Sequence, residues 1–188
     1  MNTAQQSLSK SIEQLLQQFI DTVKQTSGDL PLVEQDQQWL SPCECGDVNA
    51  DGLIAWQPCA IDDELGFANV EKAIGFTIHD DIKVFFTSFY SDVIPAKCEH
   101  GELELLFTWS KDDFERLQQN IIGHILMKQR LKQEPTLFFA VTDEDDMNLV
   151  IKNDTGEVWV EPVGCEPKTL VAKNLQEFLS TLSINYSV

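Results

Sequence analysis

Length, composition and charge exclude several classes of protein. The chain has 188 residues, 43% hydrophobic and 23% charged, which is typical of one globular domain and excludes a fibrous or disordered chain. It carries 31 acidic and 13 basic side chains, a formal net charge of −18 at pH 7. This charge repels nucleic-acid phosphates and anionic lipid head groups, so we expect no nucleic-acid partner and no direct lipid binding, and a cationic partner fits better.

The sequence also lacks targeting signals. It has no run of about eighteen apolar residues, as a membrane span requires, and its start lacks the basic-then-apolar pattern of a signal peptide. We therefore predict a cytoplasmic protein. The cysteines are odd in number and sparsely spread, which is typical of reduced thiols; they are Cys43, Cys45, Cys59, Cys98 and Cys165.

Apolar residues at steps of three and four predict a long N-terminal helix over about residues 7–26, which Gly28 ends. The stripe that defines this helix consists of Leu8, Ile12, Leu15, Leu16, Phe19, Ile20 and Val23. Residues 29–51 are polar and predict a surface connection. A short strand follows over residues 53–56, and Pro58 stops it.

The middle of the chain predicts two helices and then a strand. Residues 69–76 suit a short helix, and the apolar positions of residues 82–90 recur at steps of three and four after an acidic helix start. Over residues 102–109 the period changes to two, which predicts a strand.

The longest predicted helix begins at a capping signal. Ser110 and Asp113 have the spacing of a side-chain cap, in which the serine hydroxyl accepts from a backbone N–H and the acid reaches back. The apolar stripe of this helix consists of Phe114, Leu117, Ile121, Ile122, Ile125 and Leu126. Three cations near its C-terminus complement the helix dipole: Lys128, Arg130 and Lys132.

The last third of the chain predicts three strands and a closing helix. Residues 137–141 are apolar on both faces, which is typical of a central strand. Residues 147–152 and 157–161 flank a hairpin loop in which a glycine supplies the positive φ, and a helix over about residues 173–182 follows. The predicted fold class is therefore α/β (α+β), with residues 1–188 in one domain and a mixed sheet packed with helices.

Two patterns resemble metal sites, and both are incomplete. Residues 47–54 copy the first eight places of an EF-hand calcium loop, but Pro58 stands at the twelfth place, where a bidentate glutamate belongs. We favour an acidic turn stabilised by Asx hydrogen bonds. Cys43, Cys45 and Cys59 lack a second paired cluster at zinc-site spacing, so we predict no metal.

No catalytic constellation is evident. The sequence has no nucleophile elbow, phosphate-binding glycine loop, dinucleotide fingerprint or His-x-x-x-His pair, so we predict no cofactor and no catalytic residue. His124 is interpreted as a half-buried packing residue of the longest helix. His79 is interpreted as a cap at a helix start, in preference to a pH sensor.

The acidic residues concentrate in two windows of the sequence. Residues 44–81 hold nine acids and one lysine, and residues 143–166 hold eight acids and one lysine, so the two windows contain 17 of the 31 acids. Charge patterning alone fits a solubilising surface as well as it fits a surface that binds a cationic partner.

Several short motifs resemble one known family in both order and spacing. The motifs are Trp56-Gln57-Pro58, Asn69-Val70-Glu71, Trp109 to Phe114, Asn120 to His124, Arg130 to Lys132, Pro135 to Phe138, and Gly156-Glu157-Val158. They resemble the Syd family of SecY-interacting proteins from gamma-proteobacteria. The resemblance extends from about Ser41 to Leu182.

The resemblance implies a small cytosolic α/β protein of the SUKH superfamily without enzymatic activity. It also implies a peripheral position on the cytoplasmic face of the inner membrane, through association with SecY, where the protein would monitor or restrain the translocase. Syd-like proteins are expected to present a concave acidic surface to the cytosolic loops of SecY, which are basic by the positive-inside rule.

The candidate contact residues within this interpretation come from the first acidic window. They cluster in loops and helix starts near Trp56, whose ring would supply an apolar anchor, and they are Asp62, Asp63, Glu64, Glu71, Asp80 and Asp81. We expect Asp143, Asp145 and Asp146 to lie in a strand-connecting loop and mainly to keep the protein soluble.

Two alternatives from other functional classes stay open at this point. An immunity-type protein that neutralises a basic toxin nuclease also fits the SUKH superfamily and the acidic surface. An acidic metal-dependent enzyme would require stoichiometric metal in the purified protein. Co-purification with SecY, compared with protection from a co-expressed nuclease, separates the first alternative from the main interpretation.

Overall fold

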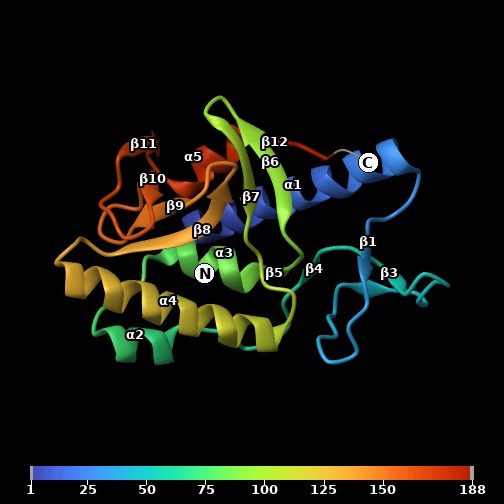
Figure 1. The fold of residues 1–188 in the computed structure, drawn as a ribbon, viewed down its shortest axis with the longest axis horizontal. Coiled ribbons are helices and arrows are strands. Elements are labelled where there is room, and N and C mark those ends of the chain that lie inside the picture. Colours follow the sequence, from blue (N-terminus) through green and yellow to red (C-terminus); the bar gives the residue numbers. More distant parts are fainter. Residues whose placement is uncertain (1, 187–188) are drawn as a thin grey trace.

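Residues 2–186 are described by a computed structural model, in which five helices pack around a curled antiparallel sheet (Figure 1). The helices are α1 (Thr3–Ser27), α2 (Ala68–Ile74), α3 (Asp80–Ser88), α4 (Lys111–Leu131) and α5 (Leu175–Ser180). This arrangement confirms the predicted fold class, a single α/β domain with helices packed on a sheet.

The central sheet has seven strands in the order β11-β10-β9-β8-β7-β6-β12. The strands are β6 (Ile94–Cys98), β7 (Gly101–Leu105), β8 (Thr136–Thr142), β9 (Met147–Lys152), β10 (Val158–Pro162), β11 (Thr169–Ala172) and β12 (Ser183–Ile184). β8 lies in the middle, as its apolar sequence predicts. Unlike the expected mixed sheet, these seven strands are antiparallel throughout, because even β7 and β8, which α4 separates in the chain, run in opposite directions.

Helices cover both faces of this sheet. Phe139 of β8 packs against Phe85 of α3 and Phe178 of α5, with ring centroids 5.8 and 5.7 Å apart. The preceding residue, Phe138, meets His124 of α4 at 5.5 Å instead. α1 packs against α3 and α5, whereas α2 packs against α4, so the two groups of helices form separate layers (Figure 1).

The first helix confirms and extends its prediction. The seven buried side chains of α1 are the seven of the predicted stripe. The helix begins earlier than predicted because Asn2 and Gln5 form a capping box, in which each side chain accepts a hydrogen bond from the backbone N–H of the other residue. It ends at Gly28, whose φ of 84° is the left-handed conformation that glycine adopts without strain.

Residues 29–51, predicted as an irregular connection, contain two short strands. β1 (Leu32–Glu34) and β2 (Glu44–Cys45) pair with the predicted strand β3 (Leu53–Trp56) in a separate three-stranded sheet. The prediction of a connection without strands is therefore wrong. Strands of two or three residues are too short to show a period of two, so only the pairing partner identifies them.

Several other boundaries also differ from prediction. The segment Phe89–Tyr90, predicted as helix, is strand β5 and pairs with β4 (Cys59–Ala60). The predicted strand over residues 102–109 ends at Leu105, and β6, β11 and β12 have no counterpart in the prediction. The closing helix ends at Ser180, slightly earlier than predicted.

Three local predictions about caps and turns are confirmed. Ser110 Oγ accepts from the N–H of Asp113 at 3.4 Å at the start of α4. His79 Nδ1 accepts from the N–H of Asp81 at 3.2 Å and so caps α3. Gly156 has a φ of 76° in the β9–β10 loop, and a Cβ there would lie 2.6 Å from Nε2 of His79. The loop therefore requires glycine for its backbone conformation and for its contact with His79.

The buried face of α4 differs from the predicted stripe. Its buried residues are Phe114, Gln118, Ile121, Ile125 and Lys128, at steps of three and four. Leu126, predicted in the stripe, is 47% exposed, and Lys128, predicted to serve the helix dipole, is 1% exposed. The stripe was defined by apolar residues alone, and that criterion misses a face that buries an amide and an ammonium group.

Lys128 belongs to a buried polar network between α4 and the sheet. Its ammonium group lies 2.6 Å from Oε2 of Glu161 in β10 and donates to the carbonyl of Cys165 at 3.2 Å. The hydroxyl of Thr136 donates its single proton to Glu161 at 2.8 Å. Because that proton is used, the hydroxyl can only accept from Nε2 of His124, which lies 3.2 Å away and therefore donates. Desolvation by burial, followed by the charge of Lys128, lowers the pKa of His124 to about 4, so the ring is neutral at pH 7.

Candidate functional site

Three of the predicted contact acids lie together in the loop between β4 and α2. Asp62, Asp63 and Glu64 are all exposed there. Asp63 also accepts a hydrogen bond at 2.9 Å from the phenolic hydroxyl of Tyr90. The pKa of Tyr90 is raised above its usual range, mainly because the hydroxyl is buried and also because of this hydrogen bond. One of the three carboxylates is therefore already held by an internal donor.

Two other predicted acids are held by a lysine at the start of α3. Lys83 Nζ lies 2.6 Å from Oε1 of Glu71 and 3.7 Å from Oδ1 of Asp80. Partial desolvation opposes ionisation of Glu71, but hydrogen bonds from Lys83 and from the N–H of Ile78 outweigh it and lower the pKa of the carboxyl. The positive charge of Lys83 weakens the field that these acids offer to a partner.

The six predicted acids therefore form two groups and not one cluster. Asp80 and Asp81 lie at the N-terminus of α3, whereas Asp63 contacts Tyr90, which follows its C-terminus. The helix has nine residues, so its ends are about 13 Å apart along the axis. Partner contact at these acids remains a prediction.

Trp56, predicted as an apolar anchor for the partner, lies in the core. It is 3% exposed, stacks on Phe19 at 5.6 Å and meets Trp109 edge-on at 5.7 Å. Its position at the end of β3 turns the ring toward α1. A ring that these neighbours already cover cannot anchor a partner, so this part of the prediction is corrected.

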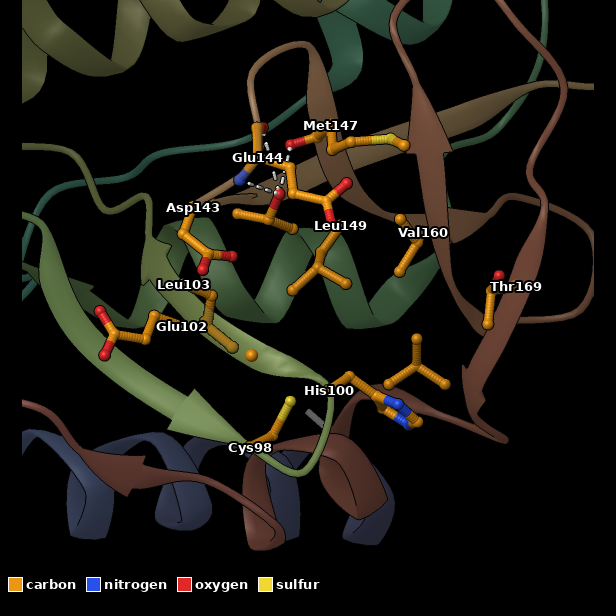
Figure 2. Close-up of a pocket in the computed structure, with 13 residues that line it drawn as sticks. Cys98, His100, Glu102, Leu103, Asp143, Glu144, Met147, Leu149, Val160 and Thr169 are labelled. Carbon is orange, nitrogen blue, oxygen red and sulfur yellow. Dashed lines mark hydrogen bonds between the residues drawn. The ribbon is translucent and has the colours of Figure 1, made fainter.

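A pocket of about 260 Å³ opens at the end of the curled sheet where β8 turns into β9 (Figure 2). Its apolar lining comes from four strands and consists of Leu103, Met147, Leu149, Val160 and Val171. Glu102, Asp143 and Glu144 stand beside this apolar surface. The arrangement combines a partly apolar hollow with negative charge at its edge.

Backbone and hydroxyl hydrogen bonds position the acids of this pocket. The N–H of Asp143 donates to the carbonyl of Glu102 at 3.3 Å, which extends the β7–β8 pairing and brings the two acids side by side (Figure 2). The hydroxyl of Thr142 accepts from the N–H of Glu144 at 3.2 Å and so fixes the start of the loop. The N–H of Val163, beyond β10, ties the loop down through the carbonyl of Asp146 at 2.8 Å.

The acids of the pocket differ from the predicted set in their surroundings. All three are exposed, and within residues 2–186 no lysine, arginine or histidine forms an ion pair with Glu102, Asp143 or Glu144. An adjoining hollow of about 250 Å³ shares Glu102 and Asp143 and adds Glu104. The acidic surface therefore continues across the end of β7 and β8. Lys97 of β6 lies opposite Glu102 in the strand ladder and His100 also lines the pocket, but neither forms an ion pair with these three acids.

The sequence held only part of the signal for this pocket. Asp143 and Glu144 belong to the second acidic window, and Glu102 and Glu104 alternate along a predicted strand. Nothing local indicates that the start of β7 and the end of β8 are neighbours, because the 21 residues of α4 separate them in the chain. The expectation that Asp143, Asp145 and Asp146 lie in a strand-connecting loop is confirmed.

The acidic turn before β3 forms the hydrogen bonds favoured from its sequence. Oδ1 of Asn49 accepts from the N–H groups of Asp51 and Leu53, both at 2.9 Å, as in an Asx turn. Within residues 2–186, no group of three His, Cys, Asp or Glu side chains is arranged to hold a metal ion.

Adding millimolar calcium is therefore expected to leave the melting temperature of the protein unchanged. A ligand that binds only the native state must raise this temperature, and the turn lacks the twelfth ligand of a complete loop. Thermal unfolding with calcium, and with magnesium as the matched control, measures the effect. A clear rise with calcium alone would contradict this interpretation of Asp47 to Gly52.

Helix length and hydropathy provide one further observation. Over the described part of the chain, no helix is both long and apolar enough to cross a membrane.

Comparison with known proteins gives a consistent result over almost the whole chain. The family model of the Syd protein (SUKH-2) matches residues 9–183, which extends the resemblance to well before Ser41. The chain is 45% identical to Protein Syd of Colwellia psychrerythraea, over 97% of this chain and 96% of that protein. It is 43% identical to Protein Syd of Alteromonas mediterranea over 92% and 96%, and 40% identical to that of Aliivibrio fischeri over 92% and 95%. None of these names denotes an enzymatic activity, and a match of this extent shows that the chain belongs to the Syd family.

Proposed function

We propose that the chain is a non-catalytic binding protein that associates with the basic cytosolic loops of the SecY translocon through an acidic surface. In this role it is a cytoplasmic protein, peripheral on the inner membrane, that monitors or restrains the translocase. Membership of the Syd family and the net charge of −18 both support this proposal. The observation that carries it is the pocket at the end of the sheet, where exposed acids that form no ion pair within the described residues adjoin apolar side chains.

The chemistry of this pocket suits a basic peptide segment. Glu102, Asp143 and Glu144 form no ion pair among the described residues, so lysine or arginine side chains of a loop can pair with them. The apolar lining can cover an aliphatic side chain or the stem of a lysine. Complementary charge then supplies rapid association and selectivity, and the covered apolar surface supplies residence time.

The acids predicted from the sequence offer a weaker site on physical grounds. Glu71 and Asp80 share Lys83, and Asp63 accepts from Tyr90. Glu64, the third acid of this loop, lines a hollow of about 170 Å³, which is smaller than the pocket at the end of the sheet. The two sites can be separated by experiment.

Two triple charge reversals locate the contact. The first changes Glu102, Asp143 and Glu144 to lysine, and the second changes Asp62, Asp63 and Glu64 to lysine. All six acids are exposed, and the two triple reversals change the total charge of the protein by the same amount. A difference in affinity between the two variants therefore cannot come from the net charge of the whole protein. We expect the pocket variant to lose at least about tenfold more affinity for SecY than the loop variant, about 1.4 kcal/mol.

Binding to purified SecY in lipid nanodiscs, with empty nanodiscs as the control, measures this difference. A larger loss from the loop variant would place the contact at the acids predicted from the sequence. Equal losses would show that net charge alone matters and would refute the pocket as the site. Undiminished binding by both variants would refute an acidic contact surface.

Salt is expected to slow association with SecY more than it changes dissociation. Exposed charges are screened over roughly 8 Å at physiological ionic strength, and raising the salt to about 0.5 M shortens this range further. Association and dissociation rates at several salt concentrations provide the measurement, with the pocket variant as the control. An association rate that does not depend on salt would contradict electrostatic steering.

A further inference from the structure

Two cysteines from different elements meet beneath the three-stranded sheet. Cys43 immediately precedes β2 and is 1% exposed, whereas Cys59 begins β4 and is half-buried. Their sulfur atoms lie 3.6 Å apart, and both are free thiols. We propose that Cys43 and Cys59 are a dithiol modification site, which a small neutral disulfide oxidises to an intramolecular disulfide. This inference does not depend on the proposed function.

The backbone holds both cysteines in place. The N–H of Cys43 donates to Oγ of Ser41 at 3.0 Å, and its carbonyl accepts from the N–H of Gln57 at 3.0 Å. Cys59 lies in the β4–β5 ladder opposite Tyr90. A disulfide requires the sulfurs to close from 3.6 Å to about 2 Å. Holding two reactants together in this way favours their reaction over reaction with groups elsewhere.

The third cysteine of this region, Cys45, is the alternative partner for a disulfide with Cys59. Cys45 lies in β2, where it pairs with Ala55 of β3, and its thiol donates to the carbonyl of Cys43 at 3.3 Å. The sulfur of Cys59 contacts that of Cys43, at 3.6 Å, whereas the thiol of Cys45 is engaged by a backbone carbonyl. The structure thus favours Cys43 over Cys45 as the partner of Cys59.

The reaction proceeds by two thiol–disulfide exchanges. The thiolate of the more accessible Cys59 attacks the reagent disulfide, forms a mixed disulfide and releases one reagent thiol. Cys43 then loses its proton, attacks the sulfur of Cys59 and releases the second reagent thiol. The two cysteines lose two electrons and two protons, and the reagent disulfide gains both and becomes two thiols.

The surroundings of the two thiols decide which oxidant is effective and how the rate depends on pH. The pKa of both thiols is raised, and the largest cause is desolvation by burial. The pKa of Cys43 rises to about 12. Thiolates are therefore scarce at neutral pH, and the reaction accelerates as the pH rises. The negative charge of Asp62 lies close enough to act on Cys59, so a neutral disulfide reacts in preference to an anionic one.

The experiment uses the full chain with Cys98→Ser and Cys165→Ser, which removes the two cysteines outside this region. The native protein is incubated with 2-hydroxyethyl disulfide at pH 8, and its intact mass and free thiols are measured. We expect the loss of two hydrogen atoms from the mass and of two of the three remaining thiols. A glutamyl endopeptidase cleaves after Glu44, between Cys43 and Cys45, so the linked peptides show whether Cys43 takes part.

Single variants in this background identify the partner. Adding Cys45→Ser should leave the loss of two hydrogens unchanged, whereas adding Cys43→Ser or Cys59→Ser should abolish it. Any of three results would overturn the proposal. The first is a reagent adduct that persists on Cys59, and the second is the same loss of two hydrogens in the Cys43→Ser variant. The third is a native protein that keeps all three thiols free over a reaction time in which the denatured chain becomes oxidised.

Discussion

Replacing Lys128 with methionine is expected to lower the free energy of unfolding by about 3 to 5 kcal/mol. The ammonium group of Lys128 lies 2.6 Å from the carboxylate of Glu161, and both side chains are buried. Without it, an uncompensated negative charge stays in the core, and the carbonyl of Cys165 loses its donor. The cost comes mainly from the carboxylate left behind, since methionine fills much of the space of the lysine stem.

Chemical denaturation of the wild type and the variant measures this change. Arg130→Met is the matched control, because Arg130 is an exposed cation of the same last turn of α4 and its loss should change stability little. Adding Glu161→Gln to Lys128→Met removes the buried charge and keeps an acceptor for Thr136, so it should recover much of the loss. A double variant no more stable than Lys128→Met alone would contradict an unpaired charge as the cause.

Lowering the pH from 6.5 to 4 is expected to remove about 3 kcal/mol of stability through His124 alone. Burial and the charge of Lys128 lower the pKa of this histidine from 6.5 to about 4 in the folded protein. Its side chain is 11% exposed, so solvent screens the effect only slightly. The groups that face the ring are Lys128, Glu161, Thr136 and Phe138.

The loss of stability at low pH follows from the difference in proton uptake by His124 between the folded and the unfolded chain. Above pH 6.5 the ring is neutral in both, and the stabilisation is fully present. As the pH falls below 6.5 the unfolded chain binds the proton and the folded chain does not, so stability declines until about pH 4. Denaturation of the wild type and of His124→Gln between pH 7 and pH 4 isolates this contribution from that of the carboxylates. Parallel pH profiles for the two proteins would contradict it.

Several elements were predicted correctly because their signals are local. The stripe of α1 uses seven apolar residues at regular steps, and β8 is a continuous apolar run. Ser110 and His79 cap helices within two or three residues of their own positions, and Gly156 supplies the positive φ of its own turn. Each of these features depends on backbone geometry that neighbouring residues impose on one another. The family was also indicated by short motifs in a fixed order, and the extent of the match confirms it.

Other features depend on partners distant in the chain, and local patterns could not predict them. β1 and β2 exist because β3 offers them hydrogen bonds, and Lys128 is buried because Glu161, on another element, supplies the opposite charge. Trp56 is covered by Phe19 and Trp109, which no local pattern places beside it. Burial of a strand, a charge or a ring is a property of the whole packing arrangement, and periodicity measures only one segment at a time.

The candidate site also depends partly on local sequence and partly on tertiary contacts. The sequence showed how many acids the chain carries and in which windows they lie, and that count sets the charge of the surface. Which acids form ion pairs was decided by folding, because Lys83 approaches Glu71 and Asp80 while no cation among the described residues forms an ion pair with Glu102 or Asp143. Pairing of β7 with β8 then places those free carboxylates beside an apolar hollow, since antiparallel strands bring the start of one to the end of the other.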